Sequence, residues 1–224
     1  MLFSMVAHEY AHAEAAYRQG DDTAYMLGRL TLNPLKHIDL FMTILLPLMT
    51  WVGSGYRMAF GGAKPVPVNP RKYRRFVSGD IIVSLAGIAV NLVLFLVCLG
   101  LFALVGLIGD GIPSLSVSLS ILQRMLAWGM YLNLVLAFFN LMPVPPLDGS
   151  HVFYHVLPPG AGLKYRQLSM LGFIPIMLII VFLPGVVQFF LWPAVWLMRA
   201  GGSLVGSLAL STDAYPVWMA VYFL

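Results

Sequence analysis

The chain has 224 residues, of which 60% are hydrophobic and 10% are charged. Soluble domains carry about 45–50% apolar residues and about a quarter charged residues, so this composition predicts a polytopic membrane protein. The net charge of +4 does not indicate nucleic-acid binding. The single cysteine, Cys98, excludes an internal disulfide. No polar segment is long enough for an appended soluble module, so we expect one domain over residues 1–224.

The first apolar segment covers residues 1–17 and ends in a basic residue and a glycine, Arg18 and Gly20. This ending is typical of the C-terminus of a helix. The segment carries the sequence H-E-Y-A-H at residues 8–12. Ionisable side chains are costly inside a membrane, so their presence in an apolar helix indicates a functional site.

The region from residue 20 to residue 79 is polar and rich in glycine and proline. Residues 28–34 alternate in polarity, which favours an extended strand at the membrane interface. Residues 40–52 are apolar but too few to span a bilayer, which suits a re-entrant or interfacial piece. These patterns predict a small membrane-associated β-structure around residues 28–70.

The rest of the chain is mostly apolar. Long helices are expected at residues 80–108 and 117–141, and two more apolar segments lie at 168–183 and 186–210. With the first segment, the sequence predicts an all-α membrane protein with about five transmembrane helices plus the re-entrant piece. The aromatic residues that end the chain, at 215–223, suit a membrane interface.

The distribution of basic residues predicts the orientation. Nine of the 13 Lys and Arg residues lie between Arg18 and Arg75, and Lys164 and Arg166 fall on the same side if residues 40–52 are re-entrant. The positive-inside rule makes this side cytoplasmic, and the basic residues near it are expected to contact membrane lipid. We therefore expect a multi-pass protein of the cell membrane.

The H-E-x-x-H sequence carries the chemistry. On a helix His8 and His12 project from one face and can bind one zinc ion, and Glu9 is placed to accept a proton from water. At 1.5 Å per residue the two histidines lie roughly 15 and 9 Å from the cytoplasmic end of their helix. The site is thus expected inside the membrane, toward the cytoplasmic side.

A catalytic zinc ion needs a third protein ligand. Asp148 is the strongest candidate, because it follows the proline-broken end of helix 117–141 in the sequence N-L-M-P-V-P-P-L-D-G at residues 140–149. Three alternatives remain open at this point: Asp148 caps the next helix, or His151 or His155 is the ligand instead.

The paired motifs at residues 8–12 and 140–149 resemble those of the site-2 protease family of intramembrane zinc metalloproteases. Residues 28–39, 63–70 and 86–91 also look like small bacterial members without a PDZ domain, and the similarity covers roughly residues 1–185. The resemblance implies that zinc is the cofactor, that His8, His12 and Asp148 bind it, and that Glu9 is general base and then acid. It further implies that Asn140 holds substrate or stabilises the oxyanion, and that the β-structure pairs with an unwound substrate.

The expected function is an intramembrane zinc metalloendopeptidase, with its catalytic core at about residues 1–160 and C-terminal helices at about 165–210. Its substrates would be single-span membrane proteins cut near the cytoplasmic face in regulated intramembrane proteolysis. Anti-sigma factors, sigma-factor precursors and remnant signal peptides all suit the family. The alternatives are a non-catalytic metal-binding membrane protein or metal transporter, and another H-E-x-x-H protease class with a glutamate as third ligand. No glutamate follows Glu14, which disfavours the last.

Overall fold

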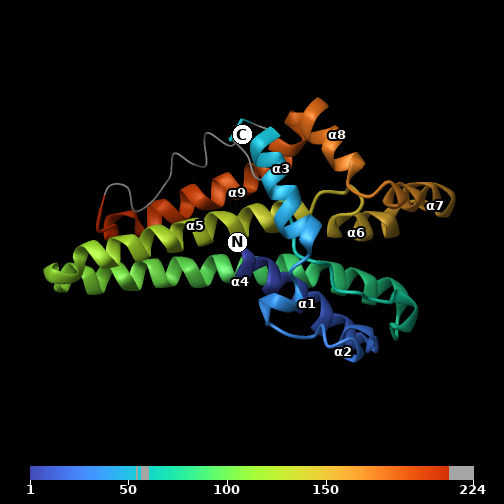
Figure 1. The fold of residues 1–224 in the computed structure, drawn as a ribbon, viewed down its shortest axis with the longest axis horizontal. Coiled ribbons are helices and arrows are strands. Elements are labelled where there is room, and N and C mark those ends of the chain that lie inside the picture. The colour runs from blue at the N-terminus through green and yellow to red at the C-terminus, as the bar shows by residue number, and fades with distance from the viewer. Residues whose placement is uncertain (54, 57–60, 212–224) are drawn as a thin grey trace. The chain divides into compact units, whose positions relative to one another are not determined.

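The structure is a computed structural model that describes residues 1–53, 55–56 and 61–211. The chain forms two compact units, Met1–Val90 and Asn91–Leu224. The α-helices are α1 (Leu2–Gln19), α2 (Thr23–Met26), α3 (Leu46–Gly53), α4 (Phe76–Gly111), α5 (Ser116–Asn140), α6 (Asp148–Val156), α7 (Pro159–Gln167), α8 (Ile174–Phe182) and α9 (Pro184–Val205) (Figure 1). Shorter helical pieces are η1 (Pro34–Lys36), the π-helix η2 (Leu40–Leu45), η3 (Pro70–Lys72), η4 (Pro113–Leu115), η5 (Leu168–Leu171) and η6 (Gly206–Leu208).

Helix α1 ends where the sequence predicts. Gly20 adopts a left-handed conformation with φ of 106°, and its N–H caps the last turn by bonding to carbonyls of that turn. Arg18 lies in that turn, where a cation is favoured by the helix dipole. The buried face of the helix carries small side chains such as Ala13 and Ala16, both fully buried. Small residues allow neighbouring backbone to approach α1 closely.

The predicted β-structure around residues 28–70 is wrong. The described part of that region holds no strand. The segment that alternates in polarity instead forms turns, because its polar groups bond locally: Asn33 Oδ1 accepts a hydrogen bond from Leu35 N, and His37 Nε2 lies 2.8 Å from Thr31 O. Backbone groups used in this way do not pair in a ladder.

Residues 61–69 run without regular secondary structure and contain Pro65 and Pro67. Proline has no N–H and is excluded from the interior of a sheet, which accounts for the missing strand. The segment is held by scattered backbone bonds, such as Gly62 N to Met42 O at 2.9 Å and Lys64 N to His37 O at 2.8 Å. It packs on α1 through Val66, which forms a buried cluster with Ala13 and Ala24.

An ion pair joins the loop after α1 to η3. The Lys72 ammonium donates a hydrogen bond to Asp22, and this bond lowers the pKa of the Asp22 carboxyl. Arg74 N also bonds to Gln19 O at 2.8 Å. The end of α1 and the chain that enters α4 are thereby tied together.

Residues 40–53 form the short apolar helix that η2 and α3 share. Asp39 caps its start, because its Oδ1 accepts hydrogen bonds from Phe41 N and Met42 N. The helix, Leu40–Gly53, is apolar but too short to span a bilayer alone. Its apolar side chains, including Leu48 and Trp51, are exposed.

In the second unit, α5 and α9 pack along the part of α4 that follows residue 90. Their shared core contains Phe102 from α4, Met130 and Leu134 from α5 and Met198 from α9, each at most 1% exposed. Figure 1 shows these three helices running side by side. Gln123 adds a buried polar contact, since its Nε2 donates to Phe102 O and Leu208 O.

The expectation of about five transmembrane helices is also wrong. Among the described residues, only α4 and α5 are long and apolar enough to cross a membrane, and a third span is possible if residues 160–171 and 174–182 are counted as one. That pair is bent by 90°. The other candidates fall short for local reasons: α1 carries ionisable side chains, and α9 contains Gln188, Pro193 and Arg199.

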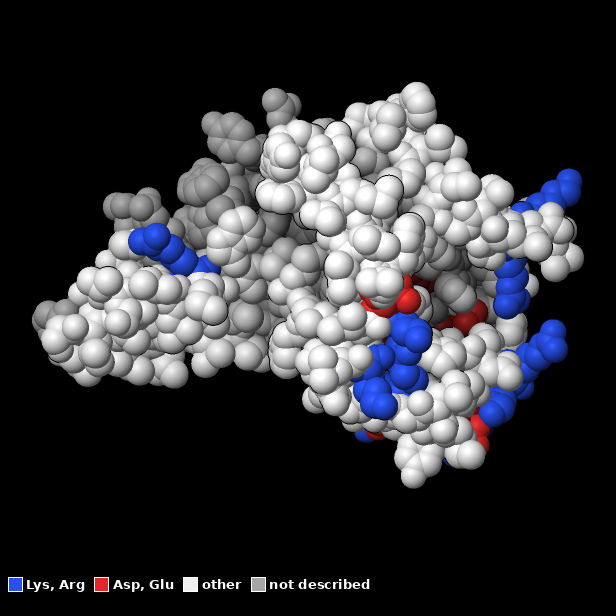
Figure 2. All heavy atoms as spheres, in the orientation of Figure 1, with Lys and Arg blue, Asp and Glu red and all other residues white. Residues whose placement is uncertain are grey.

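Charged side chains are unevenly spread over the surface. Figure 2 shows Lys and Arg side chains over the part of the molecule that Figure 1 draws as α1 and α2 and again near α7, while much of the surface along α4 carries no charged side chain. Exposed apolar residues cover the long helices α4 and α5, among them Val93, Leu96, Leu107 and Met125. Such a surface suits lipid. The expected aromatic interface residues at 215–223 lie outside the described residues.

Candidate metal centre

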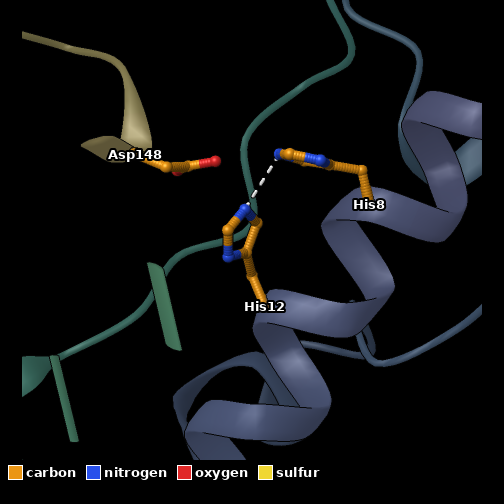
Figure 3. A group of neighbouring side chains, drawn as sticks. All are labelled: His8, His12 and Asp148. Carbon is orange, nitrogen blue, oxygen red and sulfur yellow. Dashed lines mark hydrogen bonds between the residues drawn. The ribbon is translucent and has the colours of Figure 1, made fainter. Parts of the chain in front are cut away.

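His8 and His12 project from the same face of α1, and their Nε2 atoms lie 3.0 Å apart (Figure 3). His8 is 7% exposed. The Nδ1 of His12 lies 2.7 Å from the carbonyl oxygen of Val83 on α4. A carbonyl only accepts, so Nδ1 carries the proton and Nε2 presents a lone pair. Metal-binding histidines are commonly oriented by such a bond on the other ring nitrogen.

The spacing of the two imidazoles fits zinc. Two nitrogen ligands at the usual Zn–N distance of about 2.0–2.1 Å in a tetrahedral site lie about 3.3 Å apart. The observed separation of 3.0 Å is close to this value. The donor chemistry agrees as well, because imidazole nitrogen and carboxylate oxygen are both zinc ligands.

Gly87 on α4 faces the two imidazoles and has no side chain to occupy their space. A Cβ placed on Gly87 would lie 2.5 Å from His12 Nε2 and 2.7 Å from His8 Nε2. Both distances are shorter than real Cβ contacts, so a side chain at this position would require the imidazoles or α4 to shift. Because Gly87 has no side chain, the Nε2 atoms of His8 and His12 stay accessible to a metal ion.

Glu9 lies beside His8 on α1 and is held by the segment 61–69. Its Oε2 accepts a hydrogen bond from the backbone N–H of Val66 at 2.7 Å. One carboxylate oxygen therefore has a fixed donor. A general base must present an oxygen in a defined direction, and this bond restricts the directions that the Glu9 carboxylate can take.

The second sequence motif forms the turn between α5 and α6. Asn140 is the last residue of α5, and its side-chain amide donates to Leu136 O at 2.9 Å. Asp148 is the first residue of α6 and follows the N-cap residue, Leu147. Gly149 makes the turn possible, since a Cβ there would lie 2.1 Å from Leu141 O.

His8, His12 and Asp148 are the group of metal-ligand side chains found among the described residues, and they offer two imidazole nitrogens and one carboxylate oxygen (Figure 3). His151 and His155, the rival ligands, lie on α6 but do not belong to this group.

Two residues of the site were not assigned a role from the sequence. Gly87 and Val66 both lie in stretches whose resemblance to the protease family was visible, but nothing in the local pattern indicated what they contact. A glycine inside a long apolar helix is a signal of close approach, and Gly87 could have been found in that way. The contact of Val66 joins residues 57 apart in sequence, which no local pattern reveals.

The comparisons with known proteins agree on the kind of protein. Residues 1–183 match the model of peptidase family M50. The chain is 39% identical over 193 residues to "Putative zinc metalloprotease YwhC" of Bacillus subtilis, covering 86% of this chain and 82% of that protein. It is 29% identical over 213 residues to "Putative zinc metalloprotease Rip2" of Mycolicibacterium smegmatis, covering 91% of this chain and 76% of that protein. No solved structure matches.

The family model covers well over half of the chain, and the Bacillus relative is 39% identical over most of both chains. The sequence-based prediction of a zinc metalloprotease is confirmed at this level. The apolar helices α4 and α5 agree with a membrane protein. The chain belongs to peptidase family M50, the site-2 protease family of zinc metalloproteases.

Proposed function

We propose that the protein is an intramembrane zinc endopeptidase that cuts single-span membrane proteins near the cytoplasmic face of the cell membrane. The observation that carries the proposal is the pair of imidazoles on one face of α1, with Nε2 atoms 3.0 Å apart and Glu9 beside them. The family supports peptide hydrolysis. The exposed apolar helices support action within the membrane.

In this proposal His8, His12 and Asp148 bind the zinc ion. The chemistry that zinc supplies when bound is polarisation of a carbonyl and a lowered pKa of water. Glu9 accepts a proton from the attacking water and passes it to the leaving amine. Asn140, at the end of α5, holds substrate or stabilises the oxyanion. Val83 O keeps His12 in the tautomer that binds metal.

The basic residues support a cytoplasmic orientation of the site. Nine of the 13 Lys and Arg residues lie between Arg18 and Arg75, in the part of the chain that carries the histidine pair. By the positive-inside rule this part faces the cytoplasm. Anti-sigma factors, sigma-factor precursors and remnant signal peptides are the proposed substrates, because they are membrane-inserted segments that such a site could receive.

Removal of the metal tests the activity itself. The purified protein in lipid vesicles is incubated with a panel of single-span reporters, and cleavage is followed by gel and mass spectrometry. A chelator is expected to abolish cleavage, and added zinc is expected to restore it, because the pair of histidines alone supplies no Lewis acid. A protein that binds one equivalent of zinc but cuts none of the reporters would support the alternative of a non-catalytic metal-binding membrane protein.

The third ligand is tested by Asp148→Ala. Loss of one of three protein ligands is expected to lower zinc content well below one equivalent and to remove activity with it. Zinc is measured by atomic emission on the purified protein. His151→Ala, one turn further along α6, is the matched control and should retain both properties. If zinc is lost from His151→Ala and kept in Asp148→Ala, the assignment of the ligand is wrong.

A further inference from the structure

The hydrogen bond between Val66 and Glu9 is the feature of the site that family membership does not explain. The donor is a backbone N–H and the acceptor is Glu9 Oε2, 2.7 Å away. Val66 lies between Pro65 and Pro67, neither of which has an N–H. Within this tripeptide only Val66 has a backbone N–H to donate, and the fold directs this single donor to Glu9.

The conformation of this tripeptide is restricted before any contact forms. A residue that precedes proline is disfavoured in the helical region, so Val66 is biased toward an extended backbone by Pro67. Its side chain is 7% exposed and packs with Ala13 of α1, one helical turn beyond Glu9. The Val66 side chain and N–H are therefore both anchored on the same helix, which fixes the direction of the N–H.

The flanks of the segment are anchored independently. On one side Arg29 donates from Nη2 to Lys64 O at 2.9 Å, and Lys64 N bonds to His37 O. On the other side the backbone N–H of Asn69 donates to Asp21 Oδ2, and Asp21 is fully buried. Neither anchor touches the histidine pair. They hold the chain on both sides of Val66 in place.

We propose that the backbone amide of Val66 is a positioning group for the general base: it holds one oxygen of the Glu9 carboxylate and leaves the other oriented toward the reacting water. The hydrogen bond itself comes from the geometry, and its effect on catalysis rests on the proposed function. A glutamate side chain has three rotatable bonds, and a base that samples many directions is seldom in the productive one. The fixed amide removes much of that freedom.

Val66→Pro removes the N–H and keeps an extended backbone. Cleavage of the reporter is expected to fall about 10- to 100-fold in kcat, the scale of a small misplacement of a reacting group, with KM and zinc content unchanged. Val66→Ala keeps the N–H and should retain most of the activity that Val66→Pro loses. Val68→Pro introduces proline two residues further along the same segment and leaves the Val66 N–H in place. It is the matched control and should retain activity. Equal kcat for Val66→Pro and the unaltered protein would overturn the proposal, as would loss of zinc from both proline variants.

A second measurement does not depend on activity. In protein labelled with ¹⁵N-valine, the Val66 amide is expected to exchange with deuterium at least about tenfold faster in Glu9→Ala than in the unaltered protein, because its acceptor is gone. The Val68 amide should be unaffected. Unchanged exchange at Val66 means that the contact is absent and the proposal fails. If exchange at Val66 is faster in Glu9→Ala but the unaltered protein cleaves no reporter, the contact between Val66 and Glu9 is supported and the proposed peptidase activity is rejected.

Discussion

Glu9→Gln is expected to abolish cleavage of a membrane reporter while the protein still binds one equivalent of zinc. Glutamine has nearly the shape of glutamate and can still accept a hydrogen bond from Val66 N–H, so the side chain stays where it is. It cannot accept a proton at neutral pH. General-base catalysis is worth about 10²- to 10⁴-fold, so a loss of at least 100-fold in kcat is the expected result.

The matched control is Glu14→Gln on the same helix. The Glu14 carboxylate lies 2.7 Å from Arg18 Nε in an exposed ion pair, away from the imidazoles. Exposed pairs of this kind contribute about 0.2–1 kcal/mol, so the control should fold and cleave normally. The measurement is the cleavage rate together with zinc content for both variants. Retained cleavage by Glu9→Gln would exclude Glu9 as the base and remove the basis of the mechanism.

The helical part of the site could be predicted from the sequence because it is local. Two histidines four residues apart and the glutamate beside the first lie on one turn of a helix whatever packs around them, and Gly20 ends that helix as expected. The break after α5 was equally visible, since its prolines exclude a continuing helix. These features depend on near neighbours along the chain.

The predicted β-structure failed because the alternating polarity of residues 28–34 does not show which backbone groups pair. In the structure their hydrogen bonds go to nearby partners, such as the bond between His37 Nε2 and Thr31 O. Whether a strand forms depends on a partner far away in sequence, and the neighbouring segment is interrupted by Pro65 and Pro67. For this region the prolines were therefore a better guide to the absence of a sheet than the alternating polarity was to its presence.

The number of spans failed for a different reason. Counting apolar residues does not show where a helix bends, and the apolar stretch at residues 168–183 is bent by 90° between η5 and α8. The long helices were found, but α4 covers Phe76–Gly111 and so extends beyond the predicted range of residues 80–108 at both ends. Gly109, Asp110 and Gly111 favour a turn in a soluble protein, but here they form the last helical turn of α4.

Gly87→Ala is expected to remove zinc binding without unfolding the protein. A single methyl group would lie 2.5 Å from His12 Nε2 and 2.7 Å from His8 Nε2, the two atoms that must face the metal. Either the imidazoles rotate away and lose their Nε2 spacing of 3.0 Å, or α4 shifts outward and the contact of His12 Nδ1 with Val83 O is lost. Disturbing the residues that orient metal ligands typically costs 10- to 100-fold in affinity, and a direct collision with the ligands should cost at least as much.

The control for this variant lies on the same helix. Gly100 has no atom near its Cβ position, so Gly100→Ala creates no collision and replaces glycine by a better helix former. Zinc content, helix content by circular dichroism and cleavage are measured for both variants. Gly87→Ala should lose zinc and cleavage but keep its helix content. Alanine is a good helix residue, and the added methyl group collides with the imidazoles of His8 and His12. Full zinc content in Gly87→Ala would contradict the prediction that the metal lies between these two side chains and α4.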